Sequence, residues 1–541
     1  MTNMFNNYIS CLFNKCNLIN TKRGKIILVI VILILVFLIT RIPLLSRDEI
    51  NPDGVNWHYR SQQFIVGLKS GDFLKTYQHY HPGVTLMWIM GIPVEMYKQI
   101  TGINTYDMYN FEDFHLIAKC SIVFVQLLLH GIIFFLLANI TGYKKAWYFS
   151  LLLLLEPFFV GNSRILHMDV LFTLFIFITL LLLYHSLRKG KSIWIMLSGM
   201  FIALSFLTKS IGIGLLPFGV LYIIIYFILE KKTRLIARYL LLLFLSFTAT
   251  VFLVFPAMWV KPSFVIQDIF SESERVGVRK GHTQIIMGEE TENAGFHFYP
   301  LVLAVKVSPF IQLGVFTYLL LVLIKYVKQR KINDGSLCLY LSIFYIGYLL
   351  VMSFPSKKID RYMVPLFPYL VYMAVEGYYI VFNKIVQRKK TISILLLFIL
   401  FISFVIIPNI NLFPYLFTYT NPLFGSPDKA NKIIAQKPFG MGIFEVKDKI
   451  MNKYALYGNK DKDNYPKLGF IDIKPIEAIY PNSKVFNIRE TGLGSYDYVV
   501  LGVNENLTEE MLNDSRYTLE KDLSFYINGL EYWRVYVKKP R

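Results

Sequence analysis

Cysteine is scarce in this sequence. The 541 residues contain four, Cys11, Cys16, Cys120 and Cys338, and these lack the paired spacing of a zinc site. We therefore expect no structural disulfides and no structural metal site, and the sequence offers no clear ligand set for a divalent metal. Internal repeats are also missing, which disfavours a secondary transporter, because many transporters are built from inverted repeats.

Charge is scarce as well. Charged residues make up 17% of the chain and hydrophobic residues 55%, with a mean hydropathy of +0.47. A soluble core cannot bury so much apolar side chain, so the composition indicates an integral membrane protein. Apolar runs of about 17 to 25 residues can cross a bilayer as helices. About 11 transmembrane helices are predicted, at residues 26–45, 115–140, 146–161, 169–187, 193–208, 211–229, 235–255, 309–326, 336–353, 362–383 and 391–408.

The net charge of +20 is concentrated in the short connections between these spans. They contain 21 Lys and Arg residues and two acidic residues, in segments 1–25, 141–145, 188–192, 230–238, 325–334 and 384–390. Because Lys-rich and Arg-rich loops stay on the cytoplasmic side, we predict a multi-pass protein of the cell membrane with a cytoplasmic N-terminus. This topological role accounts for the charge, so the expected partner is the lipid bilayer and not nucleic acid.

The connections on the opposite side are long. We predict a transmembrane domain over residues 1–410 with two extracytoplasmic loops, 46–114 and 256–308. The apolar piece at 84–97 in the first loop is too short to span a bilayer and is expected to lie in the membrane interface. Two long loops on one face indicate that this face carries the function.

Residues 411–541 differ in composition, with 18 basic against 16 acidic residues and no long apolar run. Helical patterns occur at 427–437 and 444–456, and alternating patterns typical of strands at 496–502 and 531–537. We predict an extracytoplasmic soluble α/β domain that follows the α-helical membrane domain.

Ionisable groups gather at the outer ends of the predicted spans. Asp53 lies near the start of the first outer loop, and Asp169 begins a span, where a helix N-terminus also favours a carboxylate. Such groups need partners or water, so they are functional candidates. Lys358 and Arg361 lie in the one basic connection on the outer side and are expected to bind a phosphate, with lipid headgroups as the alternative ligand.

These residue types fit sugar transfer from a lipid phosphate. A carboxylate can take the proton of an acceptor hydroxyl, cations can stabilise the departing phosphate, and aromatic rings can pack against a sugar. The predicted catalytic residues are Asp53 and Asp169. The predicted substrate-binding residues are Arg164, Lys358, Arg361, Trp57, Tyr59, Arg60, His81, Lys209, Trp259, His282 and Tyr362.

The order of several short motifs resembles the GT-C superfamily, and within it the phospholipid-carrier-dependent glycosyltransferases that include protein O-mannosyltransferases and lipid A aminoarabinose transferases. The matching motifs are at residues 81–85, 162–169, 208–209, 255–259, 298–299 and 358–365. That family opens its first outer loop with Asp-Glu-x-x-aromatic. Residues 53–57 (Asp-Gly-Val-Asn-Trp) fit this pattern, whereas 48–52 lack the aromatic residue. Gly54 replaces the family's usual Glu, so no metal-binding role is carried over.

The resemblance implies an inverting glycosyltransferase that moves a sugar from a polyprenyl-phosphate donor to an acceptor hydroxyl of a protein, lipid or glycan, at the extracytoplasmic membrane face. It gives Asp53 the role of base, with Asp48 as the reserve; a divalent metal stays possible, but no clear ligand set supports it. The alternatives are a polytopic secondary transporter and a glycan-polymer ligase. The identities of the sugar and of the acceptor are not predicted.

Overall fold

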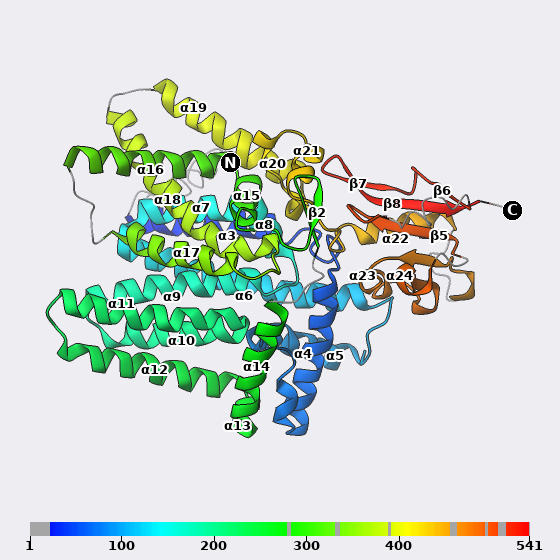
Figure 1. The fold of residues 1–541 in the computed structure, drawn as a ribbon, viewed down its shortest axis with the longest axis horizontal. Coiled ribbons are helices and arrows are strands. Elements are labelled where there is room, and N and C mark those ends of the chain that lie inside the picture. Colours follow the sequence, from blue (N-terminus) through cyan, green and yellow to red (C-terminus); the bar gives the residue numbers. More distant parts are fainter. Residues whose placement is uncertain are drawn as a thin grey trace, which may run out of the picture.

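The computed structural model describes residues 22–277, 283–329, 336–387, 391–454, 462–492, 496–506 and 516–539. Long helices run side by side through most of the molecule, and the larger sheet lies at one end of them (Figure 1). This arrangement confirms the predicted fold class, a polytopic helical protein with a C-terminal α/β region.

Within the described residues, eight helical segments are long and apolar enough to cross a membrane, and two shorter apolar helices accompany them. These are α3 (Lys22–Arg41), α6 (Phe111–Thr141), α9 (Asp169–Lys189), α10 (Ser192–Thr208), α11 (Leu215–Leu229), α12 (Arg234–Val254), α16 (Pro309–Gln329), α17 (Leu337–Ser353), α18 (Phe367–Gln387) and α19 (Thr391–Phe401), which a π-helical turn, η4 (Ile402–Ile406), joins to α20 (Ile407–Asn411). They coincide with ten of the predicted spans and indicate a multi-pass membrane protein.

The one remaining predicted span, at residues 146–161, is interrupted in the structure. Helix α7 (Tyr143–Leu155) ends before Glu156, and α8 (Pro157–Arg164) begins after it. Proline disfavours helical backbone in the residue before it, and Glu156 is extended. The Glu156 carboxylate accepts hydrogen bonds from the backbone N and the Oγ of Ser308, at 2.7 and 2.6 Å. Hydropathy did not reveal this break because apolar residues flank it on both sides.

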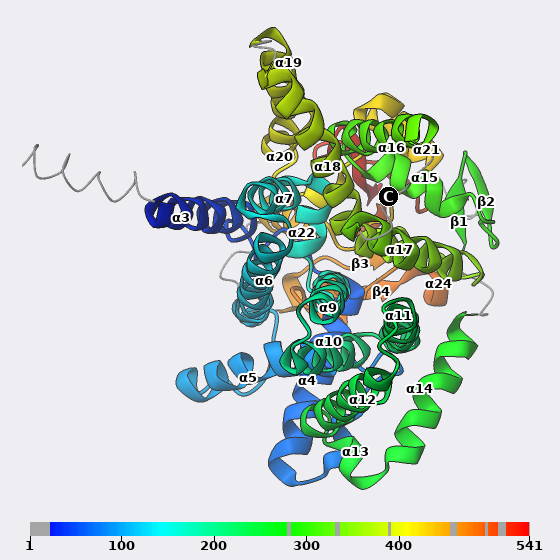
Figure 2. The same ribbon diagram turned by 90° about the vertical axis from the view of Figure 1, so that its left-hand side faces the viewer.

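The two long loops form helices that run across the spans. The first contains α4 (Pro52–Ser70), η1 (Phe73–Thr76) and α5 (Val84–Thr101); the second contains α13 (Ala257–Val260), α14 (Pro262–Gly277), β1 (Gln284–Ile286), β2 (Glu289–Thr291) and α15 (Phe298–Lys306). In Figure 2, α9 to α12 are viewed along their axes, whereas α5 and α14 are viewed from the side. Helix α5 contains the apolar piece at 84–97, whose interfacial position stays a prediction. The loops contact each other where the Tyr77 hydroxyl donates to Asp268 Oδ2 at 2.6 Å.

The C-terminal region holds a six-stranded mixed sheet in the order β4-β3-β5-β8-β6, with β7 also paired to β8. The strands are β3 (Leu468–Phe470), β4 (Val485–Asn487), β5 (Tyr498–Gly502), β6 (Tyr517–Leu519), β7 (Phe525–Ile527) and β8 (Leu530–Lys538), and the helices are α21 (Pro427–Ile433), α22 (Ile443–Lys453), α23 (Lys474–Glu477) and α24 (Ile488–Thr491). Strands β5 and β8 and helices α21 and α22 confirm the predicted patterns. The remaining short 3-10 helices are η2 (Ser210–Gly214), η3 (Asp360–Leu366), η5 (Leu416–Thr418), η6 (Pro422–Phe424), η7 (Lys462–Asn464) and η8 (Asn482–Lys484).

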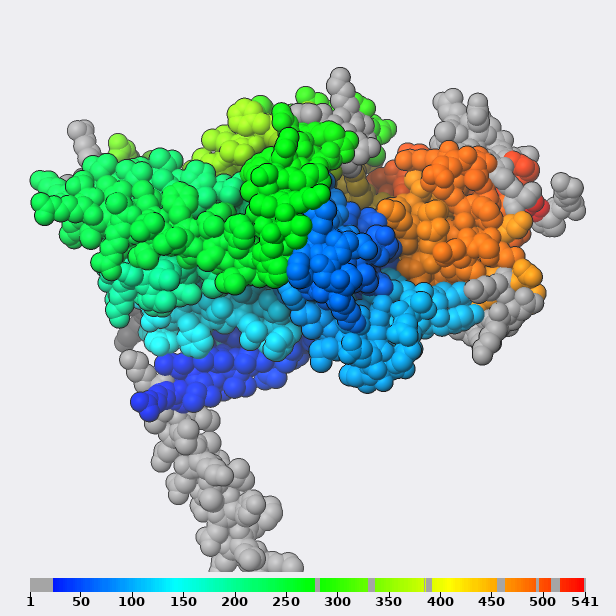
Figure 3. All heavy atoms as spheres, turned by 90° about the horizontal axis from the view of Figure 1, so that it is seen from below, coloured from blue at the N-terminus to red at the C-terminus, as the bar shows by residue number. Residues whose placement is uncertain are grey.

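The C-terminal region is joined to the start of the first loop by backbone hydrogen bonds. Ile50 N donates to Gly440 O, and Gly442 N donates to Asp48 O, each at 3.2 Å. Gly440 has a φ of +66°, and a Cβ there would lie 1.9 Å from Ile50 O, so only glycine fits. Figure 3 shows the surface of the first loop (blue) directly beside that of the C-terminal region (orange). The segment before α4, residues 48–50, is therefore attached by backbone hydrogen bonds to the C-terminal region.

Candidate active site

Asp53 lies in the first turn of α4. The Asn51 side chain caps this helix by accepting a hydrogen bond from Gly54 N at 2.6 Å, and Pro52 occupies the first helical position. This Asn-Pro-Asp sequence is typical of a helix start, and the helix N-terminus favours the carboxylate. The stretch that the sequence indicated only as a surface loop is thus a capped helix. The Asp53 side chain remains 44% exposed.

Asp169, the first residue of α9, lies close to Asp53 but is buried. Its Oδ1 accepts a hydrogen bond from Lys209 Nζ at 2.8 Å. Arg361 joins the two carboxylates, with Nη1 at 3.4 Å from Asp169 Oδ2 and Nη2 at 3.2 Å from Asp53 Oδ2. His167 lies between them too, with its ring nitrogens 3.0 Å from Asp169 and 3.5 Å from Asp53. We call these five residues the Asp53 cluster.

The surroundings of Asp53 favour its charged form. Burial by itself would raise the pKa of Asp53, but the His167 contact and the charge of Arg361 outweigh it and hold the pKa below its usual value. The carboxylate is therefore ionised at neutral pH. An ionised carboxylate can accept a proton once the contacts that stabilise its charge are weakened.

A cavity of about 270 Å³ opens beside the cluster. Asp53 and Arg361 line it, and three further cations, Lys306, Lys357 and Lys437, line it as well. The ring of Phe439 lies 4.3 Å from the Arg361 guanidinium and covers it from the C-terminal region. The basic residues of the lining outnumber its acidic ones, so the cavity suits an anionic group such as a phosphate.

A second group of charged side chains includes residues close to Asp53 and Asp169 in the sequence, but it is buried and closed off by protein groups. It consists of Asp48, Glu49, Lys119 and Arg164, and we call it the Asp48 cluster. Arg164 Nε donates to Asp48 Oδ2 at 2.8 Å, and Lys119 pairs with Asp48 and with Glu49. The other Arg164 nitrogens donate to the carbonyl oxygens of Thr40, Arg41 and Pro43. The structure therefore places Arg164, predicted to bind substrate, in a buried network with protein partners.

Two other predicted residues, Tyr362 and His81, adjoin the Asp53 cluster. Lys209, which contacts Asp169, lies with its Nζ 4.2 Å from the centre of the Tyr362 ring. His81 Nδ1 is 3.1 Å from Ser210 Oγ, directly after Lys209 in the chain. Burial lowers the pKa of His81, and the charge of Lys209 lowers it further. His81 is therefore neutral at pH 7 and able to share hydrogen bonds with a polar ligand.

Two predicted residues of α4 support the loop. Trp57 is only 1% exposed, and the Arg60 guanidinium lies 4.7 Å from its ring centre. A Cβ at Gly83 would lie 2.2 Å from the Trp57 ring, so the turn before α5 packs directly on the indole. The ring faces are thus covered in this structure, and we assign Trp57 and Arg60 to the packing of the first loop.

The remaining predicted residues lie elsewhere. Tyr59 is 64% exposed and lines a separate groove on another face of α4. Trp259 packs edge-on against Phe73, with ring centres 4.9 Å apart. Lys358 is buried and donates to Pro355 O at 2.8 Å, and its neighbour Lys357 lines the Asp53 cavity. His282 lies outside the described residues.

The geometry brings to the site three groups that are not among the predicted site residues, His167, Lys306 and Lys437. His167 belongs to the matched motif at 162–169, and its position two residues before Asp169 was the available signal. Lys306 and Lys437 come from α15 and from the segment before α22, and only the tertiary fold brings them to the cavity. Among the described residues, no three His, Cys, Asp or Glu side chains gather as metal ligands. The places beside both aspartates are taken by Arg361 and His167.

Comparisons with known proteins bear on this cluster. Residues 113–259 match the family model described as "Dolichyl-phosphate-mannose-protein mannosyltransferase". No curated protein matches the chain. Among solved structures, ArnT from Cupriavidus metallidurans bound to undecaprenyl phosphate is 14% identical, with a TM-score of 0.48 over 96% of this chain and 100% of that one. The oligosaccharyltransferase of Archaeoglobus fulgidus is 13% identical, with a TM-score of 0.44 over 88% and 69%. The family match, which contains Asp169 and Lys209, confirms the resemblance to the GT-C glycosyltransferases that the motifs indicated.

Proposed function

We propose that this protein is an inverting glycosyltransferase that moves a sugar from a polyprenyl phosphate to an acceptor hydroxyl at the extracytoplasmic membrane face. The observation that carries the proposal is a half-exposed carboxylate, Asp53, in contact with Arg361 in a cavity lined by further cations. The family match supports the donor class, because the model is named for a lipid-phosphate-linked mannose.

The reaction is a single displacement. Asp53 takes the proton of the acceptor hydroxyl as that oxygen attacks the anomeric carbon, and the bond from this carbon to the phosphate oxygen breaks. Arg361 and Lys357 stabilise the negative charge of the departing polyprenyl phosphate. Attack from the face opposite the leaving group inverts the anomeric configuration.

Arg361 links donor binding to the basicity of Asp53. While Arg361 contacts Asp53, it keeps the pKa of that carboxyl low and makes it a weak base. A donor phosphate that draws Arg361 toward itself weakens this hold, so the pKa of Asp53 rises when both substrates are present. Asp169 stays buried and acts as a positioning residue, because it holds Lys209 and Arg361.

The charge pattern supports the proposed sidedness. Helix α9 begins at Asp169 in the cluster and ends with Arg188 and Lys189 one membrane-length away. Basic connections of this kind stay in the cytoplasm, so the cluster would lie on the opposite side. Helix α4 of the first loop, whose first turn carries Asp53, and the C-terminal sheet lie toward the same end of the spans (Figure 1).

Membranes that contain the protein can be incubated with a panel of polyprenyl-phosphate sugars. We expect one sugar to be transferred with inverted configuration and free polyprenyl phosphate to be released. Transfer only from a diphosphate-linked glycan would instead assign a polymer ligase. Solute uptake into sealed vesicles without consumption of any lipid-linked sugar would assign a transporter.

A further inference from the structure

Helix α4 presents two different faces. Asp53, Trp57 and Arg60 follow one another at helical spacing on the first face, which belongs to the Asp53 cluster and its packing. Val55, Tyr59 and Gln62 share the second face and form one wall of a groove of about 660 Å³. The proposed reaction gives this groove no role.

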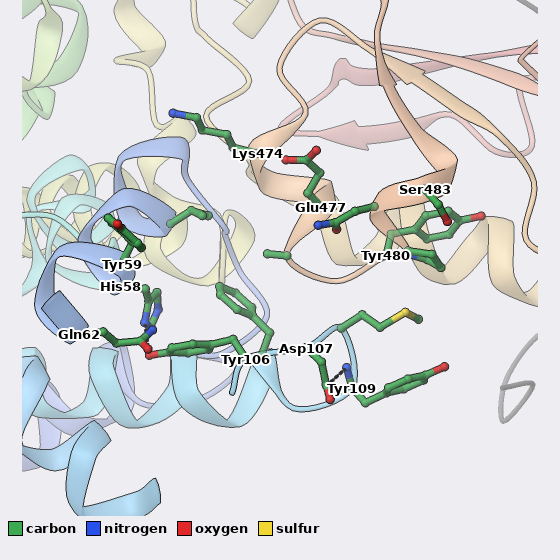
Figure 4. Close-up of a pocket in the computed structure, with 16 residues that line it drawn as sticks. His58, Tyr59, Gln62, Tyr106, Asp107, Tyr109, Lys474, Glu477, Tyr480 and Ser483 are labelled. Atoms are coloured by element: carbon green, nitrogen blue, oxygen red, sulfur yellow. Dashed lines mark hydrogen bonds between the residues drawn. The ribbon is translucent and has the colours of Figure 1, made fainter. Parts of the chain in front are cut away.

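The other walls come from two distant parts of the chain. In Figure 4, Tyr59 and Gln62 of α4 lie across from Lys474 and Glu477 of the C-terminal region, with Tyr106 of the connection before α6 below them. The groove is firmly built, because His58 lies 3.1 Å from the Tyr106 hydroxyl and 3.1 Å from His115. His115 Nε2 is in turn 2.9 Å from the carbonyl oxygen of Glu49 in the Asp48 cluster.

The groove has the chemistry of a sugar-binding surface. Two of its aromatic rings are exposed, Tyr59 by 64% and Tyr109 by 57%. Amide and hydroxyl groups that both donate and accept hydrogen bonds surround them, including those of Gln62, Asn482 and Ser483. A sugar ring has an apolar face for an aromatic ring and hydroxyl groups for such partners.

Its charge distinguishes the groove from the Asp53 cavity. The charged side chains of its lining are one cation, Lys474, and two carboxylates, Asp107 and Glu477. An excess of cations, as in the Asp53 cavity, would be needed to bind a phosphate group. The groove therefore suits a neutral, hydroxyl-rich ligand.

The groove comes close to the Asp53 end of α4, because its lining includes Val55, two residues after Asp53. Lys474 Nζ donates to the Asn56 side chain at 3.2 Å, and Asn56 is one helical turn from Asp53. Tyr59 is six residues from Asp53, about 9 Å along the helix axis.

We propose that this groove binds the acceptor and that the acceptor is a carbohydrate chain whose end reaches Asp53. This inference rests on the proposed function and names its acceptor class. A hydroxyl of the terminal sugar gives its proton to Asp53 while its oxygen replaces the phosphate oxygen on the donor's anomeric carbon. The acceptor and the donor phosphate then lie on different sides of the α4 N-terminus.

The test is a binding measurement on the purified full-length protein in lipid nanodiscs, with a panel of short neutral oligosaccharides labelled at the reducing end. We expect saturable binding of at least one, weakened about tenfold by Tyr59→Ala, as loss of a stacked aromatic contact implies. Tyr59→Phe should retain binding because it keeps the ring. The matched control is Tyr526→Ala, which removes an equally exposed tyrosine of β7 that is not among the described residues lining the groove.

Binding of undecaprenyl phosphate separates this inference from the proposed function. It should be unchanged in Tyr59→Ala and weakened in Arg361→Ala. The inference is overturned if no oligosaccharide binds, if binding does not depend on Tyr59, or if a serine-containing peptide binds in a Tyr59-dependent way instead. In each of these cases, Asp53-dependent consumption of a polyprenyl-phosphate sugar would leave the proposed function standing, and its absence would end both.

Discussion

The Asp53 cluster and the Asp48 cluster both take residues from segments 48–53 and 164–169, yet they differ in access. In the Asp48 cluster, Asp48, Glu49, Lys119 and Arg164 are all at most 3% exposed, and protein groups surround them. In the Asp53 cluster, the same kinds of side chain pair at similar distances, but Asp53 is 44% exposed and lines a cavity. Charge pairing alone therefore does not identify a reactive site. The distinguishing feature is one carboxylate whose partners leave it open to a ligand.

The closed cluster supports the open one. Glu49 Oε2 accepts hydrogen bonds from the backbone N and the side-chain amide of Asn51, each at 2.7 Å, and Asn51 caps α4 directly before Asp53. Burial opposes the charge of Glu49, but Lys119 and His115 outweigh this and lower its pKa to about 2. The ionised Glu49 thus fixes the cap that positions the proposed base.

The largest expected effect is on stability and belongs to the closed cluster. Arg164→Ala removes one of the two cations that pair with buried Asp48 and should lower the stability of the protein by about 3 to 5 kcal/mol, as loss of one member of a buried ion pair does. Thermal unfolding in detergent measures this. Arg275→Ala, which breaks only the surface pair with Glu272, should leave the unfolding temperature unchanged. Equal effects of the two changes would contradict the closed, buried character of the Asp48 cluster.

The next effect is on donor binding. Arg361→Ala removes the cation that contacts Asp53 and Asp169, and should weaken the binding of undecaprenyl phosphate by about 10- to 100-fold, as expected for a charged hydrogen-bonding group. The neutral lipid undecaprenol serves as the control ligand, because its binding should not change. If both lipids lost affinity together, Arg361 would be stabilising the fold and not holding phosphate.

A smaller effect concerns pH. Because the contact with His167 and the charge of Arg361 together depress the pKa of Asp53, the wild-type carboxylate is ionised throughout the range above its usual value near 4. Arg361→Gln removes that charge, so the pKa of Asp53 should rise and the acid limb of the rate profile should move to higher pH by about one unit. Single-turnover rates across pH measure this. An acid limb that stays in place or moves to lower pH in Arg361→Gln would contradict the proposal that Arg361 lowers the pKa of Asp53.

The smallest effect separates two neighbouring lysines. Lys357 lines the Asp53 cavity, whereas the Lys358 ammonium donates to the carbonyl oxygen of Pro355. Lys357→Ala should therefore weaken donor binding about fivefold. This loss lies between that expected for an exposed ion pair and that expected for a buried, charge-assisted hydrogen bond. Lys358→Ala should leave donor affinity within about twofold of wild type, since its change falls on the local fold. If Lys358→Ala weakened donor binding more than Lys357→Ala did, Lys358 would be a phosphate ligand, as predicted from the sequence.

The sequence predicted the spans well because apolar length is a local property. The break at Glu156 escaped, since its stabilising partner, Ser308, lies 152 residues away. In the site, the closeness of Asp53, Asp169 and Arg361 followed from the expected sidedness and was found. The buried environment of Arg164 was not predicted. Besides Asp48, its partners are the backbone carbonyl oxygens of Thr40, Arg41 and Pro43, which no motif marks. Domain boundaries and the roles of the site residues stay predictions.

The most direct test compares two aspartates five residues apart. Asp53→Asn and Asp48→Asn are purified, their folded fractions measured, and single-turnover transfer from the preferred polyprenyl-phosphate sugar followed per folded molecule. We predict that Asp53→Asn stays folded and loses transfer per folded molecule by about 10²- to 10⁴-fold, as removal of a general base does. Asp48→Asn should lower the unfolding temperature and keep transfer per folded molecule. Full transfer by Asp53→Asn would contradict the account.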